Sequence, residues 1–206
     1  MHLTILGASG ATGQEITRQA LERGHTVTAV ARNPLKIAIQ DADRLKRVSA
    51  DVRDSHSIAQ ALADSTIVLS GLGVVKGDKP GVLTAGAQAV VDARLDRIIW
   101  LGAFGTGVSA VTAGLPTRLL LQTFLRDELE DKVTADTLVL NAGGTVFHAG
   151  QISNGPLSLT RRTVSLDQVP RRLFPASVSR ATLVAAMLDE AESQHHAGHV
   201  VVPLDR

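Results

Sequence analysis

Residues 3–13, Leu-Thr-Ile-Leu-Gly-Ala-Ser-Gly-Ala-Thr-Gly, decide the fold of this chain. The first four residues form a short apolar run that is typical of a buried strand. Gly7, Gly10 and Gly13 follow at intervals of three, and a helical pattern then runs over 14–23. A strand, a glycine-rich turn and a helix in this order predict a turn that binds a pyrophosphate at the helix N-terminus. The alternative is that the glycines serve only the close packing of helix on sheet.

Outward from this turn, short β-branched runs alternate with longer helical patterns. Such alternation predicts a parallel sheet with helices on both faces, and the near-continuous apolar strands agree with burial on both sides. We therefore predict an α/β fold, a doubly wound Rossmann-like parallel sheet, in a single domain over 1–206. The expected strands are 3–6, 26–31, 47–50, 66–70, 97–101, 137–140 and 199–202; the expected helices are 14–23, 55–63, 83–95, 116–132 and 180–191.

Composition narrows the function classes. The 21 Lys and Arg residues nearly balance the 20 Asp and Glu residues, which argues against a nucleic-acid partner. Cysteine is absent, so disulfides, thiolate nucleophiles and cysteine-based zinc sites are excluded. The N-terminus lacks a signal-peptide pattern, and the uncharged stretches 98–117 and 137–160 contain too much glycine, proline and polar sequence to span a membrane. We expect a cytoplasmic monomer or homodimer without a metal site, the histidines at 195, 196 and 199 included.

Arg32 indicates which dinucleotide binds. It follows the second expected strand, 19 residues after Gly13, where NAD enzymes usually carry an acidic residue that bonds the ribose 2′-OH. A carboxylate there would repel a 2′-phosphate, whereas a guanidinium bonds it with two parallel contacts. Lys36 supplies a second cation. The sequence thus favours NADP(H) as cofactor, with a solvated surface arginine as the alternative for Arg32.

The motifs GASGATG at 7–13 and VARNPLK at 30–36 resemble those of atypical short-chain dehydrogenase/reductases. The resemblance is nearest to the NAD(P)H-binding group that holds biliverdin reductase B (flavin reductase) and the NmrA-like proteins. It runs through the whole chain and includes the segments ADVRD at 50–54, VLSGLG at 68–73, IIWLGAFGTG at 98–107, TLVLNAGG at 137–144 and SVSRATLVAAMLDE at 177–190.

Together, the motifs and this resemblance imply a set of residues that contact the cofactor. They are Gly7, Ser9, Gly10, Ala11, Thr12 and Gly13 in the turn, Arg32 and Lys36 beside it, Asp51 and Val52 flanking the adenine, Gly71, Leu72 and Gly73, then Gly102 and Ala103, Lys132, and finally Asn141, Ala142 and Gly143.

The catalytic residues are less evident, because the chain departs from the family there. Catalytic short-chain dehydrogenases use a tyrosine with a lysine four residues later, but this chain has no tyrosine, and Glu128 precedes Lys132 instead. Serines often found at the end of the fifth strand are replaced by Gly102 and Ala103. Two candidates remain. Lys132 lies on the same helix face as the repeat of Leu121, Leu125 and Leu129, although it could simply pair with the helix C-terminus. His148, expected in a loop after the sixth strand, could donate a proton or simply face solvent.

The expected substrate crevice lies among the loops 71–82, 102–116 and 141–160, outside the strand ends where open α/β sheets bind ligands. Uncharged, glycine-rich walls there suit a flat, largely apolar acceptor, or alternatively an oligomer contact. We expect an NADPH-dependent oxidoreductase that transfers hydride to an acceptor such as a flavin or quinone, since the cofactor carries this chemistry. The alternative is a non-catalytic NADP(H)-binding sensor of NmrA-like type.

Overall fold

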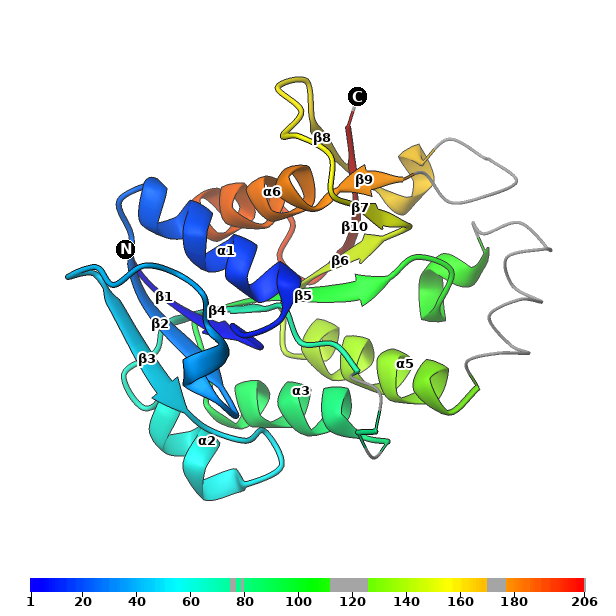
Figure 1. Cartoon of the computed structure of the whole chain (residues 1–206). Helices are drawn as coiled ribbons and strands as arrows, with labels where there is room; N and C mark the ends of the chain where they lie inside the picture. The colour runs from blue at the N-terminus through cyan, green and yellow to red at the C-terminus, as the bar shows by residue number, and fades with distance from the viewer. Residues whose placement is uncertain (75–76, 79, 112–125, 170–176, 206) are drawn as a thin grey trace.

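The computed structural model describes residues 1–74, 77–78, 80–111, 126–169 and 177–205 (Figure 1). Its centre is an 8-stranded sheet with the order β3-β2-β1-β4-β5-β6-β10-β8. Neighbouring strands are parallel except for β8, which is antiparallel to β10. The strands of this sheet are β1 (His2–Leu6), β2 (Thr26–Ala31), β3 (Leu45–Ser49), β4 (Ile67–Ser70), β5 (Arg97–Ala103), β6 (Thr145–Ala149), β8 (Arg162–Ser165) and β10 (Val200–Leu204).

Helices cover both faces of the sheet, as Figure 1 shows. The helices α1 (Ala11–Glu22) and α6 (Arg180–Ser193) pack together on one face, and α2 (Ser55–Leu62), α3 (Val82–Asp92) and α5 (Arg126–Asn141) cover the other. Two apolar layers result: Phe147 lies in the layer under α1 and α6, and Trp100 lies in the layer under the other three helices. The prediction of a doubly wound Rossmann-like sheet in one domain is confirmed.

Local signals at the helix ends explain why much of this layout was predictable. Asp54 caps α2, because its Oδ1 accepts hydrogen bonds from the backbone N–H groups of His56 and Ser57. Ser179 caps α6 in the same way, accepting from the N–H of Thr182. A side-chain oxygen at this position satisfies a donor that has no partner within the helix. Aspartate and serine are among the residues preferred at this position, so both caps are local signals.

The start of α3 is capped from another helix. Asp131 of α5 is buried, and its carboxylate accepts hydrogen bonds from the N–H groups of Leu83 and Thr84 at 3.1 and 2.8 Å and from the Thr84 hydroxyl at 2.6 Å. Burial works against the charged form, but these hydrogen bonds outweigh it and lower the pKa of the Asp131 carboxyl. The charged carboxylate of Asp131 therefore caps α3 and holds it against α5.

We expect Asp131→Asn to lower the free energy of unfolding by about 1–2 kcal/mol at pH 7, because both carboxylate oxygens accept hydrogen bonds and asparagine replaces one of these acceptors with a donor NH2 group. Because the folded-state pKa is depressed, this stabilisation is complete above the ordinary carboxyl pKa and disappears as the pH falls through the folded-state value. Urea titrations at pH 7 and pH 3 measure the difference. The exposed Asp92→Asn is the matched control, and a difference that stays constant at both pH values would contradict this assignment.

The structure corrects the sequence prediction after residue 111. Residues 137–140, expected as the sixth strand, belong to α5, and the sixth strand is β6 at Thr145–Ala149. The helix continues because Ala135 and Val139, four residues apart, both pack into the core. It is terminated by Gly143, which has a φ of 79°. Most of the expected helix 116–132 lies outside the described residues.

Five further short elements, two strands and three 3-10 helices, complete the described chain. A separate two-stranded sheet pairs β7 (Ile152–Ser153) with β9 (Val178–Ser179). Three 3-10 helices occur at η1 (Pro34–Lys36), η2 (Gly107–Val111) and η3 (Leu166–Gln168). The prediction of a loop over 141–160 is therefore wrong at the end of α5, in β6 and in β7. Among the described residues, no helix has the length and apolar character needed to cross a bilayer.

Candidate cofactor site

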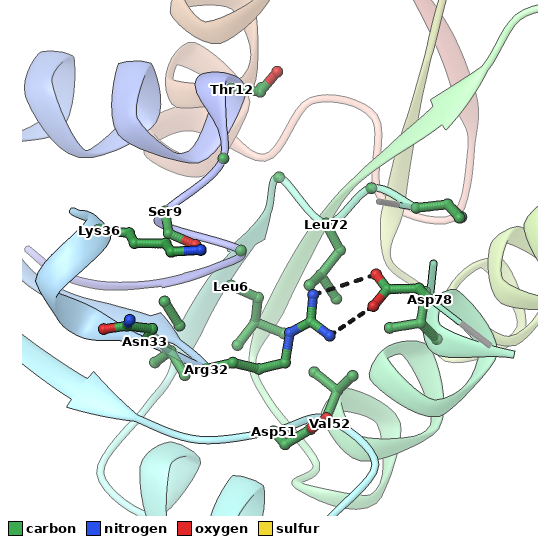
Figure 2. Close-up of a pocket in the computed structure, with 18 of the residues that line it drawn as sticks. Leu6, Ser9, Thr12, Arg32, Asn33, Lys36, Asp51, Val52, Leu72 and Asp78 are labelled. Carbon is green, nitrogen blue, oxygen red and sulfur yellow. Dashed lines mark hydrogen bonds and ion pairs between the residues drawn. The ribbon is translucent and has the colours of Figure 1, made fainter. Parts of the chain in front are cut away.

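A cavity of about 540 Å³ lies at the carboxyl ends of the central strands. Figure 2 shows its walls, which come from the segments that follow β1, β2, β3 and β4, together with Leu101 of β5. The strand order reverses between β1 and β4, and open α/β sheets bind ligands at such a switch point. The walls include Gly7, Ser9, Gly10, Ala11, Thr12, Arg32, Lys36, Asp51, Val52, Gly71, Leu72 and Gly73.

The glycine turn at 7–13, between β1 and α1, forms one wall of this cavity, the floor. Gly7 has a φ of 70°, which side-chain-bearing residues rarely adopt, and it turns the chain from β1 into α1. A Cβ atom at Gly13 would lie 2.2 Å from the carbonyl oxygen of Gly7, so only glycine allows the helix to approach this closely. Gly10 precedes α1 and carries no side chain to cap it, and Ala11 and Thr12 line the cavity. The first turn of α1 thus presents a positive helix end to the cavity.

Two cations lie on the β2 side of the cavity. Arg32 follows β2 directly, and Lys36 ends the short η1. Asn33 accepts a hydrogen bond from the N–H of Leu35 and, with Pro34 in the first position, starts η1. This tight turn brings Lys36 back to the same wall as Arg32. In Figure 2, Lys36 lies on the side of Ser9, whereas Arg32 extends across toward Asp78.

Asp78 is a cavity residue that sequence reasoning missed. Its carboxylate accepts two hydrogen bonds from the Arg32 guanidinium, at 2.7 and 3.2 Å (Figure 2). These bonds, together with the charges of Asp78 and Asp51, raise the pKa of Arg32 despite partial desolvation. No local signal in the sequence connects the two residues, since they are separated by 46 positions.

Two backbone arrangements shape the cavity walls after β3 and β4. The backbone N–H of Arg53 donates to Asp51, which turns the chain after β3 so that Asp51 and Val52 face the cavity. Gly71 packs against the helix turn, because a Cβ atom there would lie 2.9 Å from the backbone nitrogen of Gly13. Close contact between these two loops narrows the cavity at the β4 end.

Several residues predicted to contact the cofactor lie outside the cavity walls. Gly13 is buried behind the turn, and Gly102 and Ala103 end β5 just beyond Leu101. Lys132 lies on α5, where its Nζ is 3.6 Å from the carboxylate of Glu128. Of the leucines that were expected to share its helix face, Leu121 and Leu125 lie outside the described residues.

The placement of Asn141, Ala142 and Gly143 beside the cofactor is wrong. These residues form the end of α5 and the turn into β6, instead of following a strand. A Cβ atom on the adjacent Gly144 would meet Ile98 near the start of β5, whereas the cavity touches Leu101 toward the other end. They therefore lie at the opposite edge of the sheet, and we withdraw them from the candidate site.

His148 also differs from its prediction, because it is a buried residue of β6 and not a loop residue. Its Nε2 lies 2.9 Å from Oδ2 of Asp136, and its Nδ1 lies 2.7 Å from the hydroxyl oxygen of Ser109. The side chain is only 1% exposed. Since both ring nitrogens already have partners inside the protein, His148 is not placed to donate a proton to a substrate.

The Asp136–His148 pair accounts for glycine at position 102. Gly102 and His148 are register partners in adjacent strands. A Cβ atom on Gly102 would lie 2.7 Å from the His148 ring and 2.9 Å from both carboxylate oxygens of Asp136. Serine, which the related family often has at this strand end, would overlap with the pair. The Asp136 carboxylate therefore already fills this space. Its Oδ1 is buried there and has no hydrogen-bond partner among the described residues.

The histidines near the C-terminus have other contacts. His196 Nδ1 lies 2.8 Å from the buried carboxylate of Glu190, and His199 Nδ1 lies 2.8 Å from the carbonyl oxygen of Ala197. In the part of the chain that the structure describes, no three His, Asp or Glu side chains gather as a metal site would require.

The fold and the cavity together define a dinucleotide-binding protein of the Rossmann-like class: a glycine turn opens a helix at the switch point, and cations stand where β2 ends. Comparison with known families agrees. The chain belongs to the NAD(P)H-binding family, whose model matches residues 7–194. The predicted resemblance to an NAD(P)H-binding group is thereby confirmed.

Individual relatives are distant. The Bacillus subtilis protein YwnB, itself uncharacterized, is 32% identical over 123 residues, which cover 58% of this chain and 54% of YwnB. The chain spans about half or less of the curated relatives that it matches.

Solved structures show the same fold at lower identity. SP1627 of Streptococcus pneumoniae, a proposed NADH-flavin reductase, has a TM-score of 0.77 at 17% identity, with 100% of both chains covered. A short-chain dehydrogenase/reductase of Veillonella parvula, in complex with NADP, has a TM-score of 0.76 at 17% identity, covering 98% of this chain and 93% of that one.

Proposed function

We propose that this chain is an NADPH-dependent reductase that passes hydride to a flat acceptor such as a flavin or a quinone. The observation that carries the proposal is the cavity at the switch point, with a bare helix turn for its floor and Arg32 and Lys36 on its wall. These groups fit a dinucleotide, because an uncapped helix start and two cations all favour phosphate groups.

In this proposal each wall segment has a distinct task. Gly10, Ala11 and Thr12 hold the pyrophosphate, Arg32 and Lys36 bind the 2′-phosphate, and Asp51 and Val52 flank the adenine. Gly71, Leu72 and Gly73 form the wall after β4. Gly102 and Ala103 lie outside this wall, at the end of β5 next to Leu101, and we assign them to the nicotinamide end of the cofactor. Bound NADPH supplies the hydride itself, so the protein's task is to position and shield the reacting groups. Lys132 remains a candidate for orienting the acceptor.

A second candidate function is a non-catalytic NADP(H)-binding sensor. One observation favours it: Gly102 and Ala103 carry no hydroxyl group, and His148 is enclosed by Asp136 and Ser109. The reductase does not require a side chain as general acid either, because water can protonate a reduced flavin or quinone. Loss of NADPH absorbance at 340 nm after addition of FMN or menadione distinguishes the two candidate functions. The reductase gives turnover that depends on the acceptor, whereas the sensor binds NADPH without oxidising it.

We expect NADPH to bind roughly tenfold more tightly than NADH, and Arg32→Ala to remove most of this preference by weakening NADPH alone. A hydrogen bond to a charged group contributes about 1.5–3 kcal/mol, and the lower end corresponds to about tenfold. The lower end applies because Arg32 already has a carboxylate partner. Isothermal titration with both cofactors at low salt measures the ratio, with the exposed Arg94→Ala as control. Equal affinities in the unmodified protein would remove the NADP assignment.

A further inference from the structure

We propose that Asp78 determines cofactor specificity. Its carboxylate accepts the hydrogen bonds of the Arg32 guanidinium that a 2′-phosphate would need, and so limits the preference for NADPH over NADH. The inference rests on the proposed function, because it assigns Arg32 to the 2′-phosphate. It concerns a residue from the loop after β4, whose carboxylate meets the residue after β2 across the cavity.

The geometry of the pair is that of an anion bound in a prepared fork. Both terminal nitrogens of Arg32 donate to Asp78, one to each carboxylate oxygen, at 2.7 and 3.2 Å. Figure 2 shows the two side chains extended toward each other from separate walls. The Asp78 side chain is 13% exposed and that of Arg32 is 53% exposed, so the carboxylate lies on the inner side of the pair.

A phosphate group would compete for these same donors. Carboxylates and phosphates both bind guanidinium through two parallel hydrogen bonds, so one fork cannot serve both anions in this way at once. A phosphate placed beside a retained carboxylate would also experience repulsion, which is substantial at a few ångströms near a protein surface. A phosphate that uses both terminal nitrogens of Arg32 therefore requires the Asp78 carboxylate to leave them, and otherwise has only the Nε–H side of the guanidinium.

NADH makes no such demand. Its ribose carries a neutral 2′-hydroxyl, which can donate a hydrogen bond to a carboxylate, the partner that NAD-binding sites usually supply. The sequence places no acidic residue at 31–33 for this purpose, but the fold brings Asp78 to the end of β2 from a position 46 residues away. The Arg32–Asp78 pair can consequently stay intact when NADH binds, and the chain offers a suitable group to either cofactor.

The test compares NADPH and NADH binding to four purified proteins by isothermal titration: the unmodified chain, Asp78→Asn, Arg32→Ala and the double variant. Asp78→Asn keeps the side chain's shape but removes the charge. We expect it to bind NADPH about fivefold more tightly, the upper end for an exposed ion pair, and to bind NADH unchanged or up to about threefold more weakly. In the Arg32→Ala background, the same change should alter NADPH affinity by less than about twofold.

Asp64→Asn is the matched control, because it removes the same charge from an exposed residue in the turn between α2 and β4. If it strengthens NADPH binding as much as Asp78→Asn does, the effect is general electrostatics and the proposal is overturned. Weaker or unchanged NADPH binding in Asp78→Asn also overturns it. Thermal melting of each variant checks that the fold is retained.

The outcomes separate this inference from the proposed function. If Arg32→Ala weakens NADPH but Asp78→Asn does not strengthen it, Arg32 binds the phosphate and only the role of Asp78 is rejected. If Arg32→Ala leaves NADPH affinity unchanged, the 2′-phosphate site itself is wrong, and the proposed NADPH dependence falls with it.

Discussion

Replacing Gly10 with valine should abolish tight cofactor binding and leave the fold intact. The backbone at Gly10 has φ −78° and ψ 162°, an extended conformation that valine adopts readily. A Cβ atom there would meet a single neighbour, the carbonyl oxygen of Gly7, at 3.3 Å. The side chain would instead occupy the space above the first turn of α1, where the pyrophosphate is expected.

The expected loss is at least roughly 100-fold in NADPH affinity, which corresponds to about two hydrogen bonds to a charged group. A fluorescence titration with NADPH measures it, and a melting temperature close to that of the unmodified chain shows that the fold survives. Gly155→Val is the matched control, since Gly155 lies outside the cavity and a Cβ atom there would have only ordinary contacts, the nearest at 3.4 Å. Unchanged NADPH affinity in Gly10→Val would move the phosphate site away from this turn.

Gly13→Ala should have the opposite character and destabilise the protein itself. An added Cβ atom would lie 2.2 Å from the carbonyl oxygen of Gly7 and 2.7 Å from the Cα atom of Ala8. Both atoms belong to the backbone of the β1–α1 turn, so the helix must move away from the sheet to relieve the overlap. Forced overpacking of this kind costs about 1–3 kcal/mol or more.

For a chain of this size, that cost lowers the melting temperature by roughly 2–12 °C, which calorimetry can measure. NADPH affinity should fall as well, because the displaced helix no longer presents its first turn to the cavity. Gly10→Ala is the natural comparison, because the same methyl group added three residues earlier would meet one backbone oxygen at 3.3 Å, a tight contact but no overlap of the kind at Gly13. A melting temperature unaffected by Gly13→Ala would show that the turn is more pliable than its contacts indicate.

The first half of the fold was predictable because its signals are local. The glycine turn, the cap at Asp54 and the apolar run of β2 each occupy a few consecutive residues, and β2 begins and ends at the predicted positions. After β5 the signals conflict. Residues 137–140 are apolar enough for a buried strand, but their fate depends on how Ala135 and Val139 pack against the sheet. Tertiary contacts override local preference there.

The candidate site divides in the same way. Residues that follow strands β1 and β2 were located by motif and spacing, those after β3 and β4 by the family resemblance, and both groups line one cavity. The interactions that distinguish this chain join residues that are distant in sequence: Arg32 with Asp78, and His148 with Asp136 and Ser109. A single sequence contains no periodicity or spacing that pairs such residues, because the contacts exist only after the sheet has formed.

The enclosed pair beneath Gly102 has a consequence for protein engineering. Serine at position 102 would overlap with the Asp136–His148 pair as it stands, so both side chains would have to shift to admit it. Removing Asp136 alone would leave His148 with Ser109 as its remaining partner, and removing His148 alone would leave a buried carboxylate without its counterpart. The effect of a hydroxyl at position 102 therefore depends on the residues at 136 and 148, and a laboratory design that installs this hydroxyl has to treat the three positions together.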